Sequence, residues 1–148
     1  MTPEERDTFL EQASTGVLTT LRQDGSPISL PMWFVVIDRD VHVRTRASAR
    51  KVDRIERDGR ACFVVDTGAA WVDLRAVTIS GTLVEVTGSA AGAVEEALND
   101  KYRGRGVPDR VPTRTAAHYA DESRFFRLVP KQRELTWDNS KLLGAEPA

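Results

Sequence analysis

The chain has 148 residues, enough for one domain with a buried core but too few for two. Its 21 Lys and Arg residues stand against 22 Asp and Glu residues, a net charge of -1, so no overall field favours nucleic acid or an anionic membrane. There is no apolar run near the roughly 20 residues that span a bilayer and no signal-peptide pattern, so we expect one cytoplasmic domain over residues 1–148 without a membrane span.

Helical and strand patterns alternate in the first third of the chain. Acidic residues in the first turn and one apolar face predict a helix over 2–13. A β-rich run over 17–21 and an Asp-Gly reversal at 24–25 lead into a second strand over 28–37, and together they predict a hairpin. Pro31 lies in this second strand and cannot donate a ladder hydrogen bond, so it predicts a bulge or a sheet edge.

The next stretch predicts a strand that leads into a helix. Residues 41–46 alternate apolar or Thr side chains with His and Arg, which is the period of a half-buried strand. Ser48 is the candidate N-cap of the following helix, and Asp-Gly at 58–59 predicts its C-terminal end. Arg50 and Lys51 then fall in the first helical turn.

Two cations at a helix N-terminus are electrostatically unfavourable, because the amide dipoles already make that end positive. An anion bound between Arg50 and Lys51 removes this conflict, so the pair predicts an anion site. The alternative interpretation is a solvated basic helix start, paired loosely with Asp53 and Glu56.

The middle of the chain combines an apolar strand with a long β-rich segment. The run over 60–66 predicts a central strand buried on both faces, and its single cysteine, Cys62, predicts a buried thiol without chemistry. Residues 71–86 predict one long strand bent at Gly81 or two strands in succession. A second helix with an apolar stripe follows over 88–103.

The last third begins with a loop over 104–112, rich in Gly, Pro and Arg, which has the composition of a mobile flap. A short helix over 113–120 and strands over 123–130 and 131–137 follow, before a loose tail after residue 142. Six to seven antiparallel strands with intervening helices predict a mainly β, α+β domain whose sheet closes into a barrel.

Several common catalytic patterns are absent from the sequence. His42 and His118 are the only histidines, and neither stands at metal-ligand spacing, so no metal site is predicted. Gly-x-Ser-x-Gly, P-loop and Gly-x-Gly-x-x-Gly patterns are missing, which disfavours hydrolase, kinase and Rossmann functions. Trp33, Trp71 and Trp137 are each, taken alone, typical of a core or an interface.

The order of the elements and the residues at their joints resemble a known family. A strand, an Asp-Gly turn, Pro-Met-Trp-Phe at 31–34, a strand ending in Thr45 and a helix opened by Ala-Arg-Lys at 49–51 are similar to the flavin and deazaflavin oxidoreductases of the split β-barrel superfamily, related to pyridoxamine 5'-phosphate oxidase. The closing Thr-Trp-Asp-Asn-Ser-Lys-Leu at 136–142 resembles the actinobacterial branch that uses the deazaflavin F420. The resemblance implies an FMN-binding-like, six- to seven-stranded antiparallel split β-barrel.

The resemblance also implies where a cofactor binds. Arg50 and Lys51 are implied to bind its phosphate, at the position where the helix start independently predicts an anion. The strand at 31–33 runs along the cofactor ring, and the segments at Trp71 and 137–141 lie near the cleft across a dimer interface. Arg46, Arg54 and Arg57 extend the positive groove, on charge alone, toward a glutamate tail. The implied cofactor-binding residues are Pro31, Met32, Trp33, Thr45, Arg46, Arg50, Lys51, Trp71, Trp137 and Lys141.

The leading functional hypothesis is a homodimeric, F420-dependent oxidoreductase that passes a hydride from the reduced deazaflavin to an unsaturated or electrophilic small molecule. No side chain is assigned as catalytic. The alternatives are an FMN-dependent oxidoreductase of the same fold and a non-catalytic cofactor or ligand carrier, whereas the balanced charge argues against a nucleic-acid-binding barrel. Oxidation of pyridoxamine phosphate is disfavoured, because the Arg-Leu-His type motif that closes the true oxidases is missing.

Overall fold

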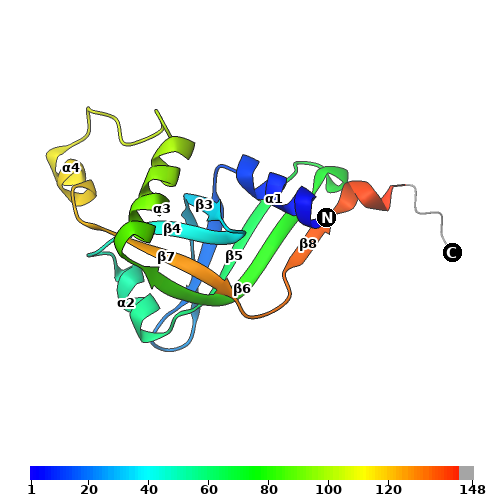
Figure 1. The fold of residues 1–148 in the computed structure, drawn as a ribbon, viewed down its shortest axis with the longest axis horizontal. Coiled ribbons are helices and arrows are strands. Elements are labelled where there is room, and N and C mark those ends of the chain that lie inside the picture. Colours follow the sequence, from blue (N-terminus) through cyan, green and yellow to red (C-terminus); the bar gives the residue numbers. More distant parts are fainter. Residues whose placement is uncertain (144–148) are drawn as a thin grey trace.

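The computed structural model describes residues 1–143, which form one curled antiparallel sheet and four α-helices (Figure 1). The helices are α1 (Pro3–Gln12), α2 (Arg50–Arg57), α3 (Gly88–Lys101) and α4 (Thr113–Tyr119), with short 3-10 turns η1 (Trp71–Asp73) and η2 (Asn139–Leu142). The strands are β1 (Gly16–Leu21), β2 (Pro27–Met32), β3 (Phe34–Ile37), β4 (Asp40–Arg46), β5 (Arg60–Thr67), β6 (Arg75–Val86), β7 (Ser123–Pro130) and β8 (Leu135–Asp138). The predicted tail lies, from residue 144 onward, outside the described residues.

The sheet follows the order β2-β1-β5-β6-β7-β4-β3, and β8 pairs with β6 beside this path. The two ends of the path, β2 and β3, are separated in the chain by Trp33 alone, so both edges of the sheet meet at this corner and the sheet curls into a half-barrel. The predicted α+β split barrel is therefore confirmed, as is the edge position of Pro31. The predicted strand over 28–37 is two strands, which brings the number to eight rather than six or seven.

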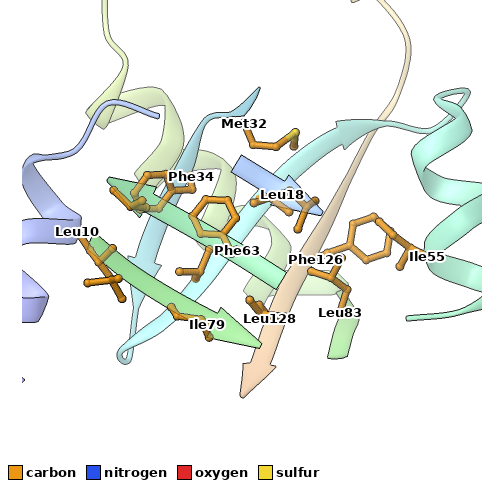
Figure 2. Packing of buried hydrophobic residues seen from close by; sticks show 14 of the residues in the cluster. Leu10, Leu18, Met32, Phe34, Ile55, Phe63, Ile79, Leu83, Phe126 and Leu128 are labelled. Carbon is orange, nitrogen blue, oxygen red and sulfur yellow. The ribbon is translucent and has the colours of Figure 1, made fainter. Parts of the chain in front are cut away.

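Apolar side chains from both halves of the sheet fill the inside of the barrel (Figure 2). Phe34 and Phe63 meet edge to face with their ring centroids 5.0 Å apart. The strand β6 is long enough to pair with β5 along one part and with β7 along the next, and Gly81 is paired with both. A Cβ atom at Gly81 would lie 2.0 Å from the carbonyl oxygen of Val129, so only glycine permits this close approach.

The helix α3 covers the outer face of β3 and β7. Its stripe of Val94, Leu98 and Tyr102 packs with Val35 and Phe125 in a second, smaller core. This stripe is the one that the apolar periodicity predicts, apart from an exposed Ala93. None of the helices described is long and apolar enough to cross a membrane.

The first helix is fixed to the sheet by a buried arginine that the sequence did not single out. Thr2 caps α1, and its side chain and that of Glu5 form a reciprocal capping box. Arg6 is only 3% exposed. Its guanidinium donates to both carboxylate oxygens of Glu134, at 2.8 and 2.5 Å, and to the carbonyl oxygen of Arg39. One side chain thereby ties α1 to the segment before β8 and to the β3–β4 turn.

The start of α2 differs from the prediction. Ala49, not Ser48, is the N-cap residue, and no side chain caps the helix. The Ser48 amide instead donates to the carboxylate of Asp121 at 2.9 Å, so Ser48 joins this turn to the segment that follows α4. The first-turn positions of Arg50 and Lys51 are as predicted.

Three further predictions about strands are wrong in detail. The strand β5 is buried on one face only, by Phe63 and Val65, and Cys62 on the other face is half-exposed. The long strand begins at Arg75, because the residues before it form η1. The last strand begins at Leu135 rather than at residue 131.

Candidate functional site

A cavity of about 660 Å³ opens beside the corner where the two sheet edges meet. Its walls come from β2 and the Trp33 connection, the end of β4, the start of α2, the C-terminal part of α3, the start of β7, and a covering segment that we define as residues 104–119. The lining residues are Pro31, Met32, Trp33, Arg44, Thr45, Arg46, Ala49, Lys51, Leu98, Arg105, Gly106, Val107, Tyr119 and Ser123. The volume is within the range of small-molecule and cofactor sites.

The charged side chains around this cavity are all cations. They are Arg44, Arg46, Lys51 and Arg105, and no Asp or Glu is among the lining residues. Within residues 1–143, none of the four forms an ion pair with a carboxylate. Their polar contacts are neutral: Arg44 donates to Asn99, Arg46 to a backbone carbonyl, and Arg105 to the Ser14 hydroxyl. Four cations with no carboxylate within ion-pair distance produce a positive potential in the cavity.

Lys51 has the most confined of these charges. The second residue of α2, it lies at the positive end of the helix, and its Nζ is 2.8 Å from the sulfur of Met32. Burial lowers the pKa of Lys51, and the neighbouring Arg54 and Arg46 lower it further. A bound anion would relieve both the desolvation and the repulsion.

Two stacked aromatic rings lie next to the cavity, and one of them, Trp33, lines it. The Trp33 indole lies parallel to the Tyr102 ring, with centroids 4.3 Å apart and planes 1° apart. Tyr102 is buried, and burial raises its pKa. Its hydroxyl accepts from the Phe34 amide at 3.0 Å and lies 3.0 Å from the carbonyl oxygens of Phe34 and Ser14, to one of which it donates.

The covering segment is attached to the barrel through the cavity cations. Arg46 donates to the carbonyl oxygen of His118 at 2.8 Å, and its guanidinium carbon lies 5.3 Å from the centroid of the Tyr119 ring. Arg105 reaches back to Ser14 on the other side of the cavity, at 3.3 Å. Figure 1 shows α4 and the loop before it at one end of the molecule.

Six of the ten predicted site residues line this cavity, namely Pro31, Met32, Trp33, Thr45, Arg46 and Lys51. Arg50 is exposed and is not part of the lining, although it adjoins Lys51. Trp71, Trp137 and Lys141 lie around η1, β8 and η2, at the opposite end of the molecule from α4 (Figure 1). There the Asn139 side chain joins Trp71 to Trp137, and Lys141 pairs with Glu5.

Eight of the fourteen lining residues were not predicted as site residues, among them Arg44, Arg105 and Tyr119, and neither was Tyr102, which stacks on Trp33. Arg44 shares the face of β4 that carries Arg46, so strand periodicity could have identified it. Tyr102 was assigned only to the apolar stripe of α3. Arg105 and Tyr119 reach the cavity from the covering segment, and no periodic pattern in the sequence indicates where a loop of this kind folds.

Comparisons with known proteins agree with this architecture. Residues 2–136 match the family model described as pyridoxamine 5'-phosphate oxidase. Among curated proteins, no sequence matches the chain. A crystal structure of a conserved hypothetical protein from Mycobacterium tuberculosis is 27% identical, with a TM-score of 0.82 over 100% of this chain and 91% of that one.

Two more distant structures share the fold. A structure titled F420 reductase is 21% identical, with a TM-score of 0.64 over 87% of this chain and 94% of that one. The FAD binding protein from Mycobacterium smegmatis is 18% identical, with a TM-score of 0.62 over 91% of this chain and 98% of that one. Because the family model covers most of the sequence and the fold agrees with these structures, the chain belongs to the pyridoxamine 5'-phosphate oxidase family, in the split-barrel superfamily.

Proposed function

We propose that this chain is an F420-dependent oxidoreductase that reduces an unsaturated or otherwise electrophilic small molecule. The observation that carries the proposal is the composition of the cavity. Four cations without carboxylate partners line it together with the exposed Trp33 ring. A planar cofactor with phosphate and carboxylate groups matches both features, because its ring and its negative charges find complementary surfaces in one place. The fold neighbour titled F420 reductase is consistent with this choice.

The positive charges extend beyond the cavity, which favours a long anionic cofactor over a short one. Arg54 and Arg57 follow Lys51 along α2, and they donate to Thr20 and to the Leu21 carbonyl rather than to carboxylates. Burial lowers the pKa of Arg54, and the nearby Arg22 and Arg57 add to this effect. F420 carries an oligoglutamate tail beyond its phosphate, whereas FMN ends at the phosphate, so these additional cations favour F420.

In this proposal the protein binds the cofactor, orients it and shields it from water, while the cofactor performs the reaction. Lys51 and Arg46 hold the phosphate, and Pro31, Met32 and Thr45 line the space beside the ring. When bound, reduced F420 supplies the hydride that the small molecule accepts. The covering segment keeps water from the cavity, a role in which Arg46 takes part through its contacts with α4. No side chain of this chain is assigned as an acid or a base.

We also propose that the active form is a homodimer. On the outer face of the sheet, Pro31, Val17, Val64, Thr78 and Leu135 are paired in one uncharged row across five strands. Leu135 is 68% exposed, and Trp137 on the same face is 62% exposed, a large apolar area for a solvent-facing surface. A second copy packed on this face would cover it.

The row also explains how Trp137 could serve the cavity. Pro31 lines the cavity at one end of the row, while Leu135 and Trp137 lie four strand spacings away, roughly 19 Å at about 4.8 Å a strand. Within one chain Trp137 is therefore remote from the site. A two-fold axis through the row would place the Trp71–Trp137 end of one copy beside the cavity of the other.

A fluorescence titration of the purified protein with F420 and, in parallel, with FMN tests the proposed function. We expect F420 to bind more tightly than FMN. The control variant Arg127→Ala loses one positive charge outside the cavity and should bind like the wild type. Tighter binding of FMN would identify FMN, rather than F420, as the cofactor. Absence of binding to both would refute the oxidoreductase proposal, and binding of F420 without its oxidation by any of a panel of electrophilic substrates would support a carrier.

A further inference from the structure

We infer that the open face of the Trp33 indole stacks against the planar ring of the bound cofactor, and that Tyr102 is the positioning residue that sets the plane of this indole. This inference rests on the proposed function and adds two side-chain roles to it. The resemblance of the 31–34 segment to the family implies that Trp33 lies along the cofactor ring, but it implies neither the stacking of the indole nor a role for Tyr102.

The direction of the Trp33 side chain follows from its neighbours. Met32 and Phe34 both point into the barrel core, where they are 8% and 0% exposed. Because successive residues of an extended chain alternate in direction, Trp33 between them points outward. There it meets Tyr102 at the end of α3, which covers one face of the indole. Trp33 remains 36% exposed and lines the cavity, so its other face is the accessible one.

Tyr102 is held so firmly that it can fix the indole. Its hydroxyl accepts from the Phe34 amide and donates to the carbonyl oxygen of either Phe34 or Ser14, and all three backbone atoms lie 3.0 Å from it. The Lys101 ammonium lies 5.5 Å from the centroid of the Tyr102 ring and 4.0 Å from that of Phe34. A ring anchored at its hydroxyl and packed in the core cannot rotate without breaking these contacts.

The surroundings specify what kind of ring would stack there. An exposed, preoriented indole is a favourable contact for any planar conjugated system, and stacked aromatic pairs contribute beyond the area that they bury. Lys51 and Arg46 line the same cavity, so the preferred ligand carries negative charge next to its ring. Both F420 and FMN fit this description, and the inference holds for whichever of them binds.

The test uses the full-length protein and three variants. Trp33→Leu removes the aromatic face and keeps an apolar side chain, Trp33→Phe keeps a smaller aromatic face, and Tyr102→Phe keeps the stacked ring but removes its hydroxyl. Binding is followed by the fluorescence of F420 or FMN, which stacking on an indole quenches. We expect Trp33→Leu to weaken binding about ten-fold and to abolish the quenching at saturation, and Trp33→Phe to restore most of the affinity.

Tyr102→Phe distinguishes positioning from a merely structural role. If Tyr102 orients the indole, the variant binds cofactor at saturation with incomplete quenching. A lower melting temperature with full quenching at saturation would show that Tyr102 only stabilises the fold and would overturn this part of the inference. Unchanged affinity and quenching in Trp33→Leu would overturn the stacking itself. Failure of the wild type to bind either cofactor would instead refute the proposed function, and the inference with it.

Discussion

At the scale of single residues, Lys51 and Arg50 provide a direct test of the anion site. They are neighbours in the first turn of α2 and were predicted as an equal pair, but only Lys51 lines the cavity. We expect Lys51→Ala to weaken cofactor binding by about 1–3 kcal/mol, the scale of a hydrogen bond to a charged group. Arg50→Ala should have a smaller effect that disappears at high salt, because the exposed Arg50 charge interacts with the bound anion through solvent. Equal losses, measured by titration at low and high salt, would contradict this assignment.

The stability of the fold depends on the protonation state of Lys101. Burial lowers its pKa from 10.5 to about 8, although Glu11 opposes this effect. Between these two pH values the unfolded chain binds more protons than the folded one, so the free energy of unfolding should rise as pH increases from 8 toward 10.5. Below pH 8 the cost of burying the charge is fully present. Above pH 10 the raised pKa of Tyr102 acts in the opposite direction.

A Lys101→Met variant isolates this effect. Lys101 is only partly buried, so after allowance for solvent screening we expect the variant to be about 1–2 kcal/mol more stable at pH 7. The difference from the wild type should shrink as pH approaches 9.5. Urea unfolding of both proteins at pH 7.0, 8.5 and 9.5 measures it, and a difference that does not vary with pH would exclude Lys101 as its source.

At the scale of secondary-structure elements, α1 is held by Arg6. Replacing this guanidinium with an apolar side chain leaves the Glu134 carboxylate without its partner, so Arg6→Met should lower the free energy of unfolding by about 2–4 kcal/mol. The matched control is Arg39→Met, since Arg39 pairs with Asp7 but is 58% exposed, and its loss should cost less than about 1 kcal/mol. Denaturant unfolding of the two variants compares them, and similar costs would contradict the role given to Arg6.

The elements also show how far the sequence predicts this fold. Strands with a clear alternation, such as β4, and helices with caps or apolar stripes, such as α1 and α3, follow from local patterns. Thr45 and Lys51, which these local patterns put at the end of a strand and the start of a helix, both line the cavity. The break at Trp33 was missed, because the chain remains extended there and only the sheet topology distinguishes two edge strands from one long strand.

Contacts that depend on distant segments could not be predicted. Ser48 has the composition of an N-cap, but its amide bonds to Asp121, which is 73 residues away. Arg6 looks like a solvent-facing residue of a polar helix until Glu134 is folded against it. Arg105 and Tyr119 lie in a segment whose path is set by tertiary contacts. Arg105 and Tyr119 complete the lining of the cavity, so the sequence predicts the scaffold better than the cavity it supports.

At the scale of the whole molecule, the exposed outer face predicts a dimer. Leu135→Arg introduces a charge at one end of the uncharged row on this face without changing any residue of the cavity. We expect the wild type to sediment as a dimer and the variant as a monomer, because two buried, unpaired charges would face the interface. If Trp71 and Trp137 complete the cavity of the partner, the monomer should also bind cofactor more weakly. A wild-type monomer with normal affinity would contradict both expectations.

Because the single-residue connection between β2 and β3 joins the two edges of the sheet, the position of Trp33 depends on closure of the barrel. Trp33 reaches its position only when the two edges of the sheet, β2 and β3, have met. A chain that has collapsed without this closure therefore has no surface to which the cofactor could bind. Cofactor should therefore retard the loss of the native state while leaving the rate of refolding unchanged. Stopped-flow measurements with and without cofactor would reveal this asymmetry, and faster refolding in its presence would mean that the corner is organised before the barrel closes.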